Sequence, residues 1–423
     1  MERTYRKSVT PSGITLLTET MPERLTCSLG LWVKCGARDE PAEWLGISHL
    51  VEHMLFKGTG RRDARAIAQS LESLGGHLDA FTAREQVCVY ARALGENLPE
   101  VVDVLADIVC RSTLAPVEVE REKAIVREEI LSYEDNPEEK INDLLSEQVW
   151  GGHALGQPIL GTAETVDALT AAQLRDYHAR RYRPENLLVS AVGPLEHERV
   201  AALVERHFAP PTGEPMPLSA APPPFRPSVR HEVSDLQQLY ISLGTRAVPY
   251  ADAGNPVLSV LNTLLGGGMS SRLFQSVREE AGLAYSVYSV PDLYRDAGML
   301  SIHMGVLPER GREALARTRD ELERLRRDGP DEEEFVAAQR QLKGGVVMDN
   351  ESISTRVIQL AHEEIYRGGY ASLQEQIDRV LSVTREQVAD AARHYLDPSR
   401  FALTALGPAP GGPLSEKDWA VAG

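Results

Sequence analysis

Five consecutive residues, His49-Leu50-Val51-Glu52-His53, have the types and spacing that zinc chemistry requires. On a helix, residues four apart share a face, so His49 and His53 can present their imidazoles to one metal ion. Glu52 lies beside that face, where it could take a proton from a metal-activated water without binding the metal itself. This H-x-x-E-H order is the counterpart of H-E-x-x-H in reverse. The competing interpretation is a surface helix with polar histidines, since the chain has 11 of them.

A third metal ligand must come from another segment, because a catalytic zinc site uses three protein ligands and keeps one position for water. The predicted helix over 117–133 offers five candidates: Glu118, Glu120, Glu122, Glu128 and Glu129. Glu122 and Glu129 are two helical turns apart and share a face on which Glu128 does not lie. A charge-rich helix is usually just solvated, so spacing alone leaves the ligand open.

The elements that must position these residues follow a simple order in the first half of the chain. The pattern predicts a strand, two helices, a strand-like stretch and long helices over 27–36, 47–57, 64–74, 78–94 and 98–133. The second half repeats strand, helix, Gly-rich turn, strands and helices. Strands that gather into sheets with helices over one face predict an α+β fold of two α/β sandwiches rather than an alternating parallel sheet.

An internal repeat with a constant offset of 214 residues supports two homologous halves. Ser28-Leu29-Gly30 matches Ser242-Leu243-Gly244, and Ala191-Val192-Gly193-Pro194 matches Ala405-Leu406-Gly407-Pro408. Eight of the eighteen residues from Pro210 to Pro227 are proline, which predicts a stiff extended linker.

The repeat therefore predicts an N-terminal half over 1–209, a linker over 210–227 and a C-terminal half over 228–423. With the same offset, His49, Glu52 and His53 fall on Thr263, Gly266 and Gly267, which have no metal-binding side chains. We therefore expect the chemistry in the first half.

Composition and charge exclude several classes of protein. The chain of 423 residues is 42% hydrophobic and 25% charged, which is typical of a globular protein, and its net charge of -17 disfavours nucleic acid and anionic membranes as partners. No apolar run approaches the roughly 20 residues of a membrane span, and the N-terminus lacks the apolar core of a secretory signal. We therefore expect a cytoplasmic location. The four cysteines form no C-x-x-C pair, so we expect reduced thiols rather than disulfides or a cysteine metal site.

Several motifs, in order along the chain, together resemble peptidase family M16, the group of zinc peptidases that includes pitrilysin, insulysin and the mitochondrial processing peptidase. They are Gly46–Thr59, Leu78–Glu85, Glu122–Asp135, Gly266–Phe274 and Arg278–Ser286. The resemblance spans both halves and implies the M16 peptidase fold, a LuxS/metallohydrolase-like architecture.

The resemblance also assigns roles to residues of this chain. It implies that Glu129, 76 residues after His53, is the third metal ligand and that Glu122 assists the site without binding metal. Arg278 and Tyr285 match a family pair that holds the substrate carbonyl and stabilises its oxyanion. Without the family pattern, Arg278 would be read as a surface partner of Glu279 or Glu280, and Tyr285 as a core aromatic.

A substrate-binding strand is implied at Ala80, Phe81 and Thr82, where family members add the peptide as an extra edge strand. The family usually has Asn where this chain has Asp79. An amide donates and accepts hydrogen bonds whereas a carboxylate only accepts, so this departure bears on specificity more than on catalysis.

The sequence thus predicts a zinc metalloendopeptidase that cleaves short or unfolded peptides inside a closed chamber, with one zinc ion per chain and Glu52 as general base. Two histidines and a carboxylate also accept Mn²⁺ or Co²⁺. The length resembles the short, M16B-type subfamily, and because one chain carries every element of the site, a homodimer is the expected assembly. The alternatives are a subunit that needs a different partner chain and a non-catalytic M16-like peptide-binding or assembly subunit.

Overall fold

The chain, described here over residues 3–419 of a computed structural model, divides into two compact units. The first unit comprises Met1–Ser132, Gln157–Ala220 and Asp349–Tyr370, and the second comprises Tyr133–Gly156, Ala221–Met348 and Ala371–Gly423. The continuous halves predicted from the sequence, 1–209 and 228–423, therefore differ from the compact units in two segments. Residues 133–156 pack with the second unit, and residues 349–370 pack with the first.

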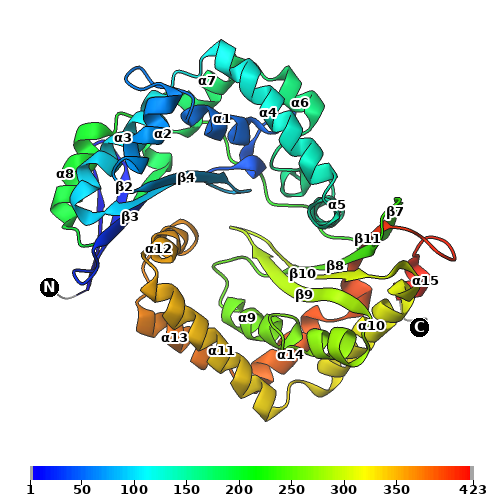
Figure 1. Ribbon diagram of the computed structural model, residues 1–423. Coiled ribbons are helices and arrows are strands. Elements are labelled where there is room, and N and C mark those ends of the chain that lie inside the picture. The colour runs from blue at the N-terminus through cyan, green and yellow to red at the C-terminus, as the bar shows by residue number, and fades with distance from the viewer. Residues whose placement is uncertain (1–2, 420–423) are drawn as a thin grey trace. The chain divides into compact units, whose positions relative to one another are not determined.

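The first unit is built on a six-stranded mixed sheet of order β1-β2-β6-β3-β5-β4 (Figure 1). Only the pairing of β2 with β6 is parallel. Its strands are β1 (Thr4–Val9), β2 (Thr15–Thr20), β3 (Thr26–Val33), β4 (His77–Thr82), β5 (Val87–Leu94) and β6 (Leu187–Gly193). The stretch predicted as strand-like over 78–94 is a hairpin of β4 and β5, which the Arg84-Glu85 turn connects.

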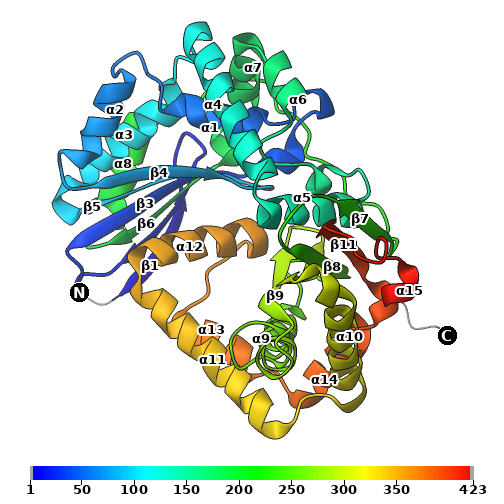
Figure 2. The ribbon, with the colours of Figure 1, turned by 45° about the vertical axis from the view of Figure 1, so that its right-hand side comes forward.

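Two hydrophobic clusters cover the two faces of this sheet. Neighbouring residues of a strand point to opposite faces, so Leu31 belongs to the larger cluster and Trp32 to the smaller one. Most helices pack on the first face, and α12 alone among the described helices supplies core residues to the second (Figure 2). The helices are α1 (Ile47–Leu55), α2 (Ala64–Glu72), α3 (Leu98–Arg111), α4 (Pro116–Glu134), α6 (Ala163–Ala168), α7 (Ala171–Arg181), α8 (His197–His207) and α12 (Ile353–Arg367).

The second unit is built on a five-stranded sheet of order β7-β11-β8-β10-β9. Its strands are β7 (Val229–Val233), β8 (Leu239–Ala247), β9 (Ala284–Leu293), β10 (Gly298–Val306) and β11 (Ala402–Gly407). Helix α5 packs on β8 and β11 from one face, and the other helices build the main core. The helices are α5 (Pro137–Trp150), α9 (Asn255–Leu265), the π-helix η6 (Phe274–Glu280), α10 (Gly311–Asp328), α11 (Glu332–Glu351), α13 (Leu373–Leu381), α14 (Arg385–Tyr395) and α15 (Glu416–Trp419).

The repeat predicted from the sequence is confirmed by the topology of the two sheets. The order β2-β6-β3-β5-β4 in the first unit corresponds to β7-β11-β8-β10-β9 in the second, and β2–β6 and β7–β11 are the parallel pairs. Helices α7 and α14 begin with the same capping box, in which Thr170 pairs with Gln173 and Thr384 with Gln387.

The matching glycines of the repeat lie where a helix from the other half of the chain crosses each sheet. A Cβ at Gly30 would lie 3.0 Å from Val357 of α12, and a Cβ at Gly244 would lie 3.0 Å from Leu145 of α5. Both glycines therefore allow a helix to approach the sheet backbone closely. The two helices that are exchanged between the halves, α5 and α12, thus each approach a sheet at the matching glycine.

The proline-rich segment 210–227 contains no helix or strand, as predicted. Its first part is nevertheless fixed to the first unit by two buried arginines. Arg38 donates to Ser219 Oγ at 2.9 Å and to the Ala220 carbonyl at 3.1 Å, and Arg181 donates to the Met216 carbonyl at 3.0 Å.

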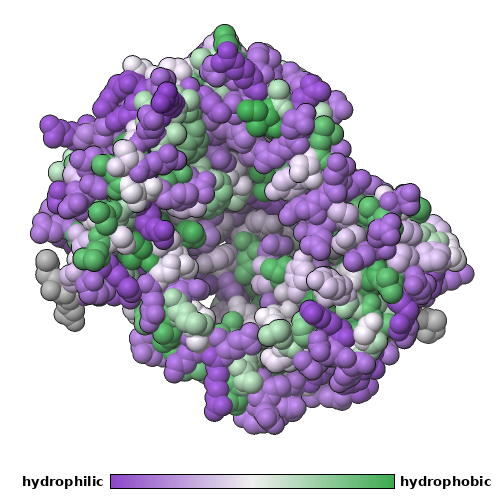
Figure 3. Space-filling model, viewed as in Figure 1, coloured by the Kyte–Doolittle hydropathy of each residue, from purple (hydrophilic) through white to green (hydrophobic). Residues whose placement is uncertain are grey.

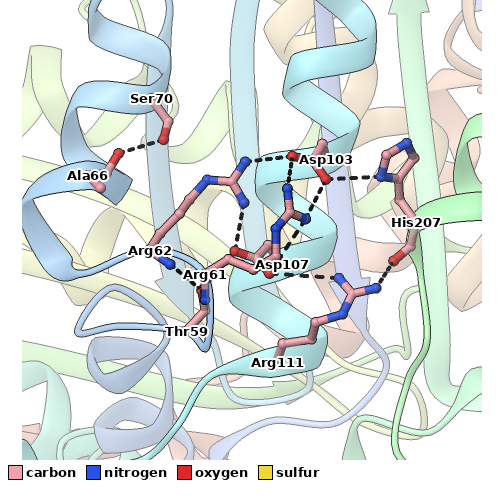
Figure 4. A network of polar contacts seen from close by, with 9 residues as sticks. All are labelled: Thr59, Arg61, Arg62, Ala66, Ser70, Asp103, Asp107, Arg111 and His207. Carbon is pink, nitrogen blue, oxygen red and sulfur yellow. Dashed lines mark hydrogen bonds and ion pairs between the residues drawn. The ribbon is translucent and has the colours of Figure 1, made fainter.

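A polar network fixes the segment that follows α1 (Figure 4). Arg61 and Arg62 bind Asp103 of α3, Arg62 also binds Asp107 at 2.7 Å, and His207 Nδ1 lies 3.0 Å from Asp103 Oδ1. Although partial burial opposes it, hydrogen bonds from both arginines lower the pKa of Asp103. The segment between α1 and α2 is thereby tied to α3 and to the end of α8.

On the face shown in Figure 3, hydrophilic residues predominate and hydrophobic ones are scattered in small groups. Within residues 3–419, we find no helix that is both long and apolar enough to cross a membrane. The four cysteines are unpaired, as predicted.

Candidate metal centre

Helix α1 presents the H-x-x-E-H residues from a helix whose other side is anchored in the main core. Leu50, Val51 and Met54 are buried among the core side chains of the first unit. Because this apolar side fixes the rotation of the helix, the polar side faces β4, which packs against α1 (Figure 1).

A buried carboxylate holds the beginning of α1. Glu40 accepts the backbone N–H groups of Gly46 and Ser48, each at 2.7 Å, and so satisfies two donors that a helix start leaves unpaired. Burial raises the pKa of Glu40 to about 8 against the lowering effect of these hydrogen bonds. Gly46 has a φ of 89°, and a Cβ there would lie 2.5 Å from the Leu160 carbonyl, so this position requires glycine.

Ligand atoms of His49, His53 and Glu129 all lie within 4.8 Å of one another. Glu129 Oε2 is 3.7 Å from Nε2 of each histidine. Two atoms that bind one tetrahedral zinc ion at 2.0–2.1 Å lie about 3.4 Å apart, so the observed separations fit such an ion with only small adjustment. The structure thus brings together the three residues that the sequence analysis named as metal ligands.

The protonation state of His49 suits metal binding. Burial, with a smaller contribution from the charge of His53, lowers the pKa of His49 to about 3. Its imidazole is therefore neutral at neutral pH, which is the form that binds a metal ion. A carboxylate and neutral imidazoles are a donor set typical of zinc peptidase sites.

Glu122 and Glu128 lie in different environments, although both were candidates on α4. Glu122 is buried, and its Oε2 lies 3.2 Å from His53 Nδ1, the ring nitrogen that Glu129 does not face. Its Oε1 binds the ammonium of Lys57 at 2.7 Å. Glu128 is exposed. Glu122 therefore contacts a candidate ligand from outside the three-ligand cluster, and Glu128 takes no part in that cluster.

Glu52 lies on the same side of α1 as the two histidines but outside the three-ligand cluster. Thr82 donates its hydroxyl to Glu52 Oε2 at 2.7 Å, which holds one carboxylate oxygen and leaves the other without a hydrogen bond from Thr82. Burial raises the pKa of Glu52, although the Thr82 hydrogen bond and His53 oppose that rise. A raised pKa suits a group that must both take and return a proton.

Strand β4 forms the free edge of the first sheet, next to α1. It contains Ala80, Phe81 and Thr82, the three residues predicted to bind substrate. They do not point the same way: Ala80 and Thr82 lie toward the main core and Glu52, whereas Phe81 packs edge-on against Trp32 on the opposite face.

Arg278 and Tyr285 belong to the second unit, where they contact each other. The Arg278 guanidinium lies 5.9 Å from the centre of the Tyr285 ring and 4.6 Å from that of Phe274. Tyr285 is 78% exposed, so it is not a core aromatic. Arg278 also lies 3.6 Å from Glu279, the surface partner considered above. It is carried by the π-helix η6, a rare element that often occurs at functional sites.

Models of known protein families match both halves of the chain. Residues 15–163 match the model described as insulinase (peptidase family M16), and residues 168–342 match the one described as the peptidase M16 inactive domain. A Mycobacterium tuberculosis protein named "uncharacterized zinc protease" is 40% identical over 95% of this chain and 93% of its own length. The chain belongs to peptidase family M16. A Bacillus subtilis protein also named "uncharacterized zinc protease" is 35% identical over 94% of this chain and 97% of its own length.

Solved structures confirm the M16 peptidase fold. The peptidase M16 inactive domain from Pseudomonas fluorescens superposes with a TM-score of 0.90 at 24% identity, covering 96% of this chain and 98% of that one. A protease from Helicobacter pylori gives a TM-score of 0.86 at 19% identity, covering 96% and 100%. The predicted fold class is thus confirmed.

The contacts of three polar residues around this M16 site were not predicted from the sequence. Glu40 holds the start of α1, Lys57 pairs with Glu122, and Thr82 binds Glu52 rather than only lying on the substrate strand. Lys57 carried a signal, since the helix predicted over 47–57 would place it one turn after His53 and on the same side, although α1 itself ends at Leu55. The other two depend on contacts between distant segments, which spacing does not show.

Proposed function

We propose that the protein is a zinc-dependent metalloendopeptidase, with one zinc ion held by His49, His53 and Glu129 and with Glu52 as general base. The observation that carries this proposal is the grouping of the three ligand atoms within 4.8 Å next to a buried carboxylate of raised pKa. The zinc proteases among its relatives support the choice of metal.

Zinc, when bound, would supply Lewis-acid chemistry that makes water acidic and polarises a peptide carbonyl. Glu52 takes a proton from the attacking water on the oxygen that Thr82 does not hold, and then gives it to the leaving amine nitrogen. Thr82 fixes the orientation of the carboxylate during both transfers, and Glu122 keeps the ring of His53 in place.

The free edge of β4 supports peptides as the substrate class. An extended peptide can add to this edge as another strand, with main-chain hydrogen bonds to Ala80 and Thr82 and little dependence on side chains. Phe81, whose ring lies on the opposite face, would contact alternate side chains of the peptide. Short or unfolded peptides, enclosed in a chamber during cleavage, are the substrates that fit this mode of binding.

Arg278 and Tyr285 are proposed to hold the scissile carbonyl and stabilise its oxyanion. A guanidinium and a phenol hydroxyl both donate hydrogen bonds, and the contact between the two side chains would present them together. Because one chain carries all these groups, we propose a homodimer of self-sufficient chains as the assembly.

Two matched glutamine variants and a chelator test the proposal. Glu52→Gln should retain zinc and lose at least about 100-fold in peptide cleavage, because an amide cannot accept the proton. Glu129→Gln should lose zinc as well as activity, whereas the exposed neighbour Glu128→Gln should retain both. Zinc content by elemental analysis and cleavage of a peptide library, with and without a chelator, are the measurements.

The outcomes separate the alternatives. Tight zinc binding without cleavage of any peptide would favour a non-catalytic peptide-binding or assembly subunit. Cleavage by Glu52→Gln at the wild-type rate would remove Glu52 from the mechanism. Activity that appears only after a different chain is added would replace the homodimer by a heterodimer.

A further inference from the structure

The backbone groups on the open edge of β4 can be assigned from its hairpin with β5. The Ala83 N–H donates to the Gln86 carbonyl at 2.8 Å, so this is a hydrogen-bonded pair. Such pairs alternate along an antiparallel ladder, and the register continues through Phe81↔Cys88 and Asp79↔Tyr90. Asp79 and Phe81 therefore direct their backbone groups toward β5. Ala80, which lies between them, directs its N–H and carbonyl toward the open edge.

The side chain of Asp79 already occupies one of these edge donors. Its Oδ1 accepts the Ala80 N–H at 2.8 Å, and its Oδ2 accepts the Tyr90 hydroxyl at 3.1 Å. Both carboxylate oxygens are thus held, although the side chain is 54% exposed. An extended peptide that pairs with β4 needs the Ala80 N–H for one of its carbonyls, so the peptide and Asp79 compete for the same donor.

We propose that Asp79 is an autoinhibitory guard on the substrate edge, which blocks the Ala80 N–H in the free protein and turns away when a peptide strand binds. This inference rests on the proposed function, in which β4 receives the substrate. The guard selects for peptides that form enough other contacts along the strand to displace the carboxylate. It also blunts an edge that could otherwise pair with other extended chains.

Two substitutions separate the hydrogen bond from the charge. Asp79→Ala removes both the acceptor and the charge, whereas Asp79→Asn removes the charge but keeps an oxygen at the same position. Asp235→Ala, which removes an exposed carboxylate of the second unit, is the control for loss of one negative charge.

Peptide binding is measured in the Glu52→Gln background, where binding is not followed by turnover. The probe is a terminally blocked, fluorescent peptide without charged side chains that the wild-type protein cleaves. Asp79→Ala should lower its Kd by about three- to tenfold, the worth of one hydrogen bond no longer in competition. Asp79→Asn and Asp235→Ala should leave the Kd within about twofold of the parent. An unchanged or higher Kd for Asp79→Ala overturns the guard, and equal tightening by Asp79→Asn assigns the effect to charge instead.

Hydrogen exchange tests the guard in the free protein, independently of any peptidase activity. The backbone amide of Ala80 should exchange several-fold faster in Asp79→Ala than in the wild type, and Tyr90→Phe, which frees the second carboxylate oxygen, should give an intermediate rate. If the exchange of residues 77–82 is the same in all three proteins, the guard does not exist, whatever the protein cleaves. If exchange responds but no peptide is bound or cleaved, the proposed function fails and the contact remains.

Discussion

Lys57, which is partly exposed, forms an ion pair with the buried Glu122, which in turn contacts His53. Glu122 is 3% exposed, and its two carboxylate oxygens lie 2.7 Å from Lys57 Nζ and 3.2 Å from His53 Nδ1. The lysine thus supplies the positive charge that keeps a buried carboxylate in place next to the candidate ligand.

Replacing Lys57 should weaken metal binding without removing a ligand. We expect Lys57→Met to bind zinc about 10- to 100-fold more weakly, because the loss of a residue that helps to orient a metal ligand lowers metal affinity by about this factor. Competition with a chromophoric chelator gives the affinity. Lys57→Arg, which keeps the positive charge, should retain the wild-type zinc affinity to within a few-fold. A wild-type zinc affinity in Lys57→Met, with Glu122 intact, would show that the lysine does not position the site.

We expect His303 to make the stability of the second unit depend on pH. This histidine of β10 is buried, and its two ring nitrogens form hydrogen bonds with the hydroxyls of Ser242 and Ser301, each at 2.8 Å. Burial lowers its pKa to about 4. Between the unfolded value of 6.5 and about 4, the unfolded chain takes up a proton at this site that the folded chain does not. Stability from this residue is therefore present above pH 6.5 and is lost as the pH falls, by up to about 3 kcal/mol.

The measurement is the melting temperature as a function of pH from 8 to 4. His303→Gln cannot titrate, so its melting temperature should fall less steeply over this range than that of the wild type. His394→Gln, at an exposed position, should keep the wild-type slope. Identical slopes for all three proteins would contradict the assignment.

At the level of residues, the sequence predicted those parts of the site that lie close together on one helix or repeat a family spacing. His49, Glu52 and His53 could be derived from helical periodicity, and the resemblance was needed to choose Glu129. Thr82 and Glu40 could not be placed in their roles, because their contacts with α1 arise only when distant segments pack together.

Strand β8 and helix α5 are in contact at Gly244, and this contact can be tested by adding one methyl group. We expect Gly244→Ala to lower the free energy of unfolding by about 1–3 kcal/mol, since its Cβ would press on Leu145 at 3.0 Å and Val149 at 3.1 Å. Chemical denaturation of the purified protein measures the change.

Gly345 provides the matched control for this substitution. It lies inside α11, where an added Cβ meets no atom within 4 Å apart from the neighbouring backbone of its own helix. Gly345→Ala should therefore raise the free energy of unfolding by up to about 1 kcal/mol, the difference in helix propensity between the two residues. Destabilisation by both substitutions to the same extent would mean that the contact with α5 is not the cause.

At the level of elements, the sequence pattern located β3, α1, α2 and the long helical stretch of α3 and α4, but it predicted neither β1 and β2 nor the sheet on which each helix packs. The helices predicted over 47–57 and 64–74 are α1 and α2 with slightly earlier ends. The exchange of α5 and α12 could not be predicted, because an amphipathic pattern shows that a helix has an apolar face and not which apolar surface covers it.

The exchange of helices makes the two halves of the chain dependent on each other. A fragment of residues 1–227 contains α5 without its sheet, and it lacks α12, whose Val357 and Leu360 are buried with Trp32. The fragment of residues 228–423 contains α12 without the sheet on which it packs, and it lacks α5. We expect each fragment alone to aggregate or to bind a hydrophobic dye, whereas the two fragments expressed together should form a one-to-one complex.

Size-exclusion chromatography and dye binding measure this dependence. A cut after Pro227 separates each exchanged helix from the sheet on which it packs. A fragment that is monomeric and unfolds cooperatively by itself would contradict the expectation.

The same connectivity determines when the first sheet of a newly made chain can be covered on both faces. Trp32 leaves the ribosome early, whereas α12 begins only at Ile353, so at 5–20 residues per second the sheet face around Trp32 waits roughly 15–65 s for its cover. During the later part of that interval, this face of the first sheet is an exposed apolar surface on a chain that has already made all six strands of the sheet. A chain interrupted anywhere before α12 keeps that surface exposed, which makes it a substrate for chaperones and for the proteases that remove incomplete proteins.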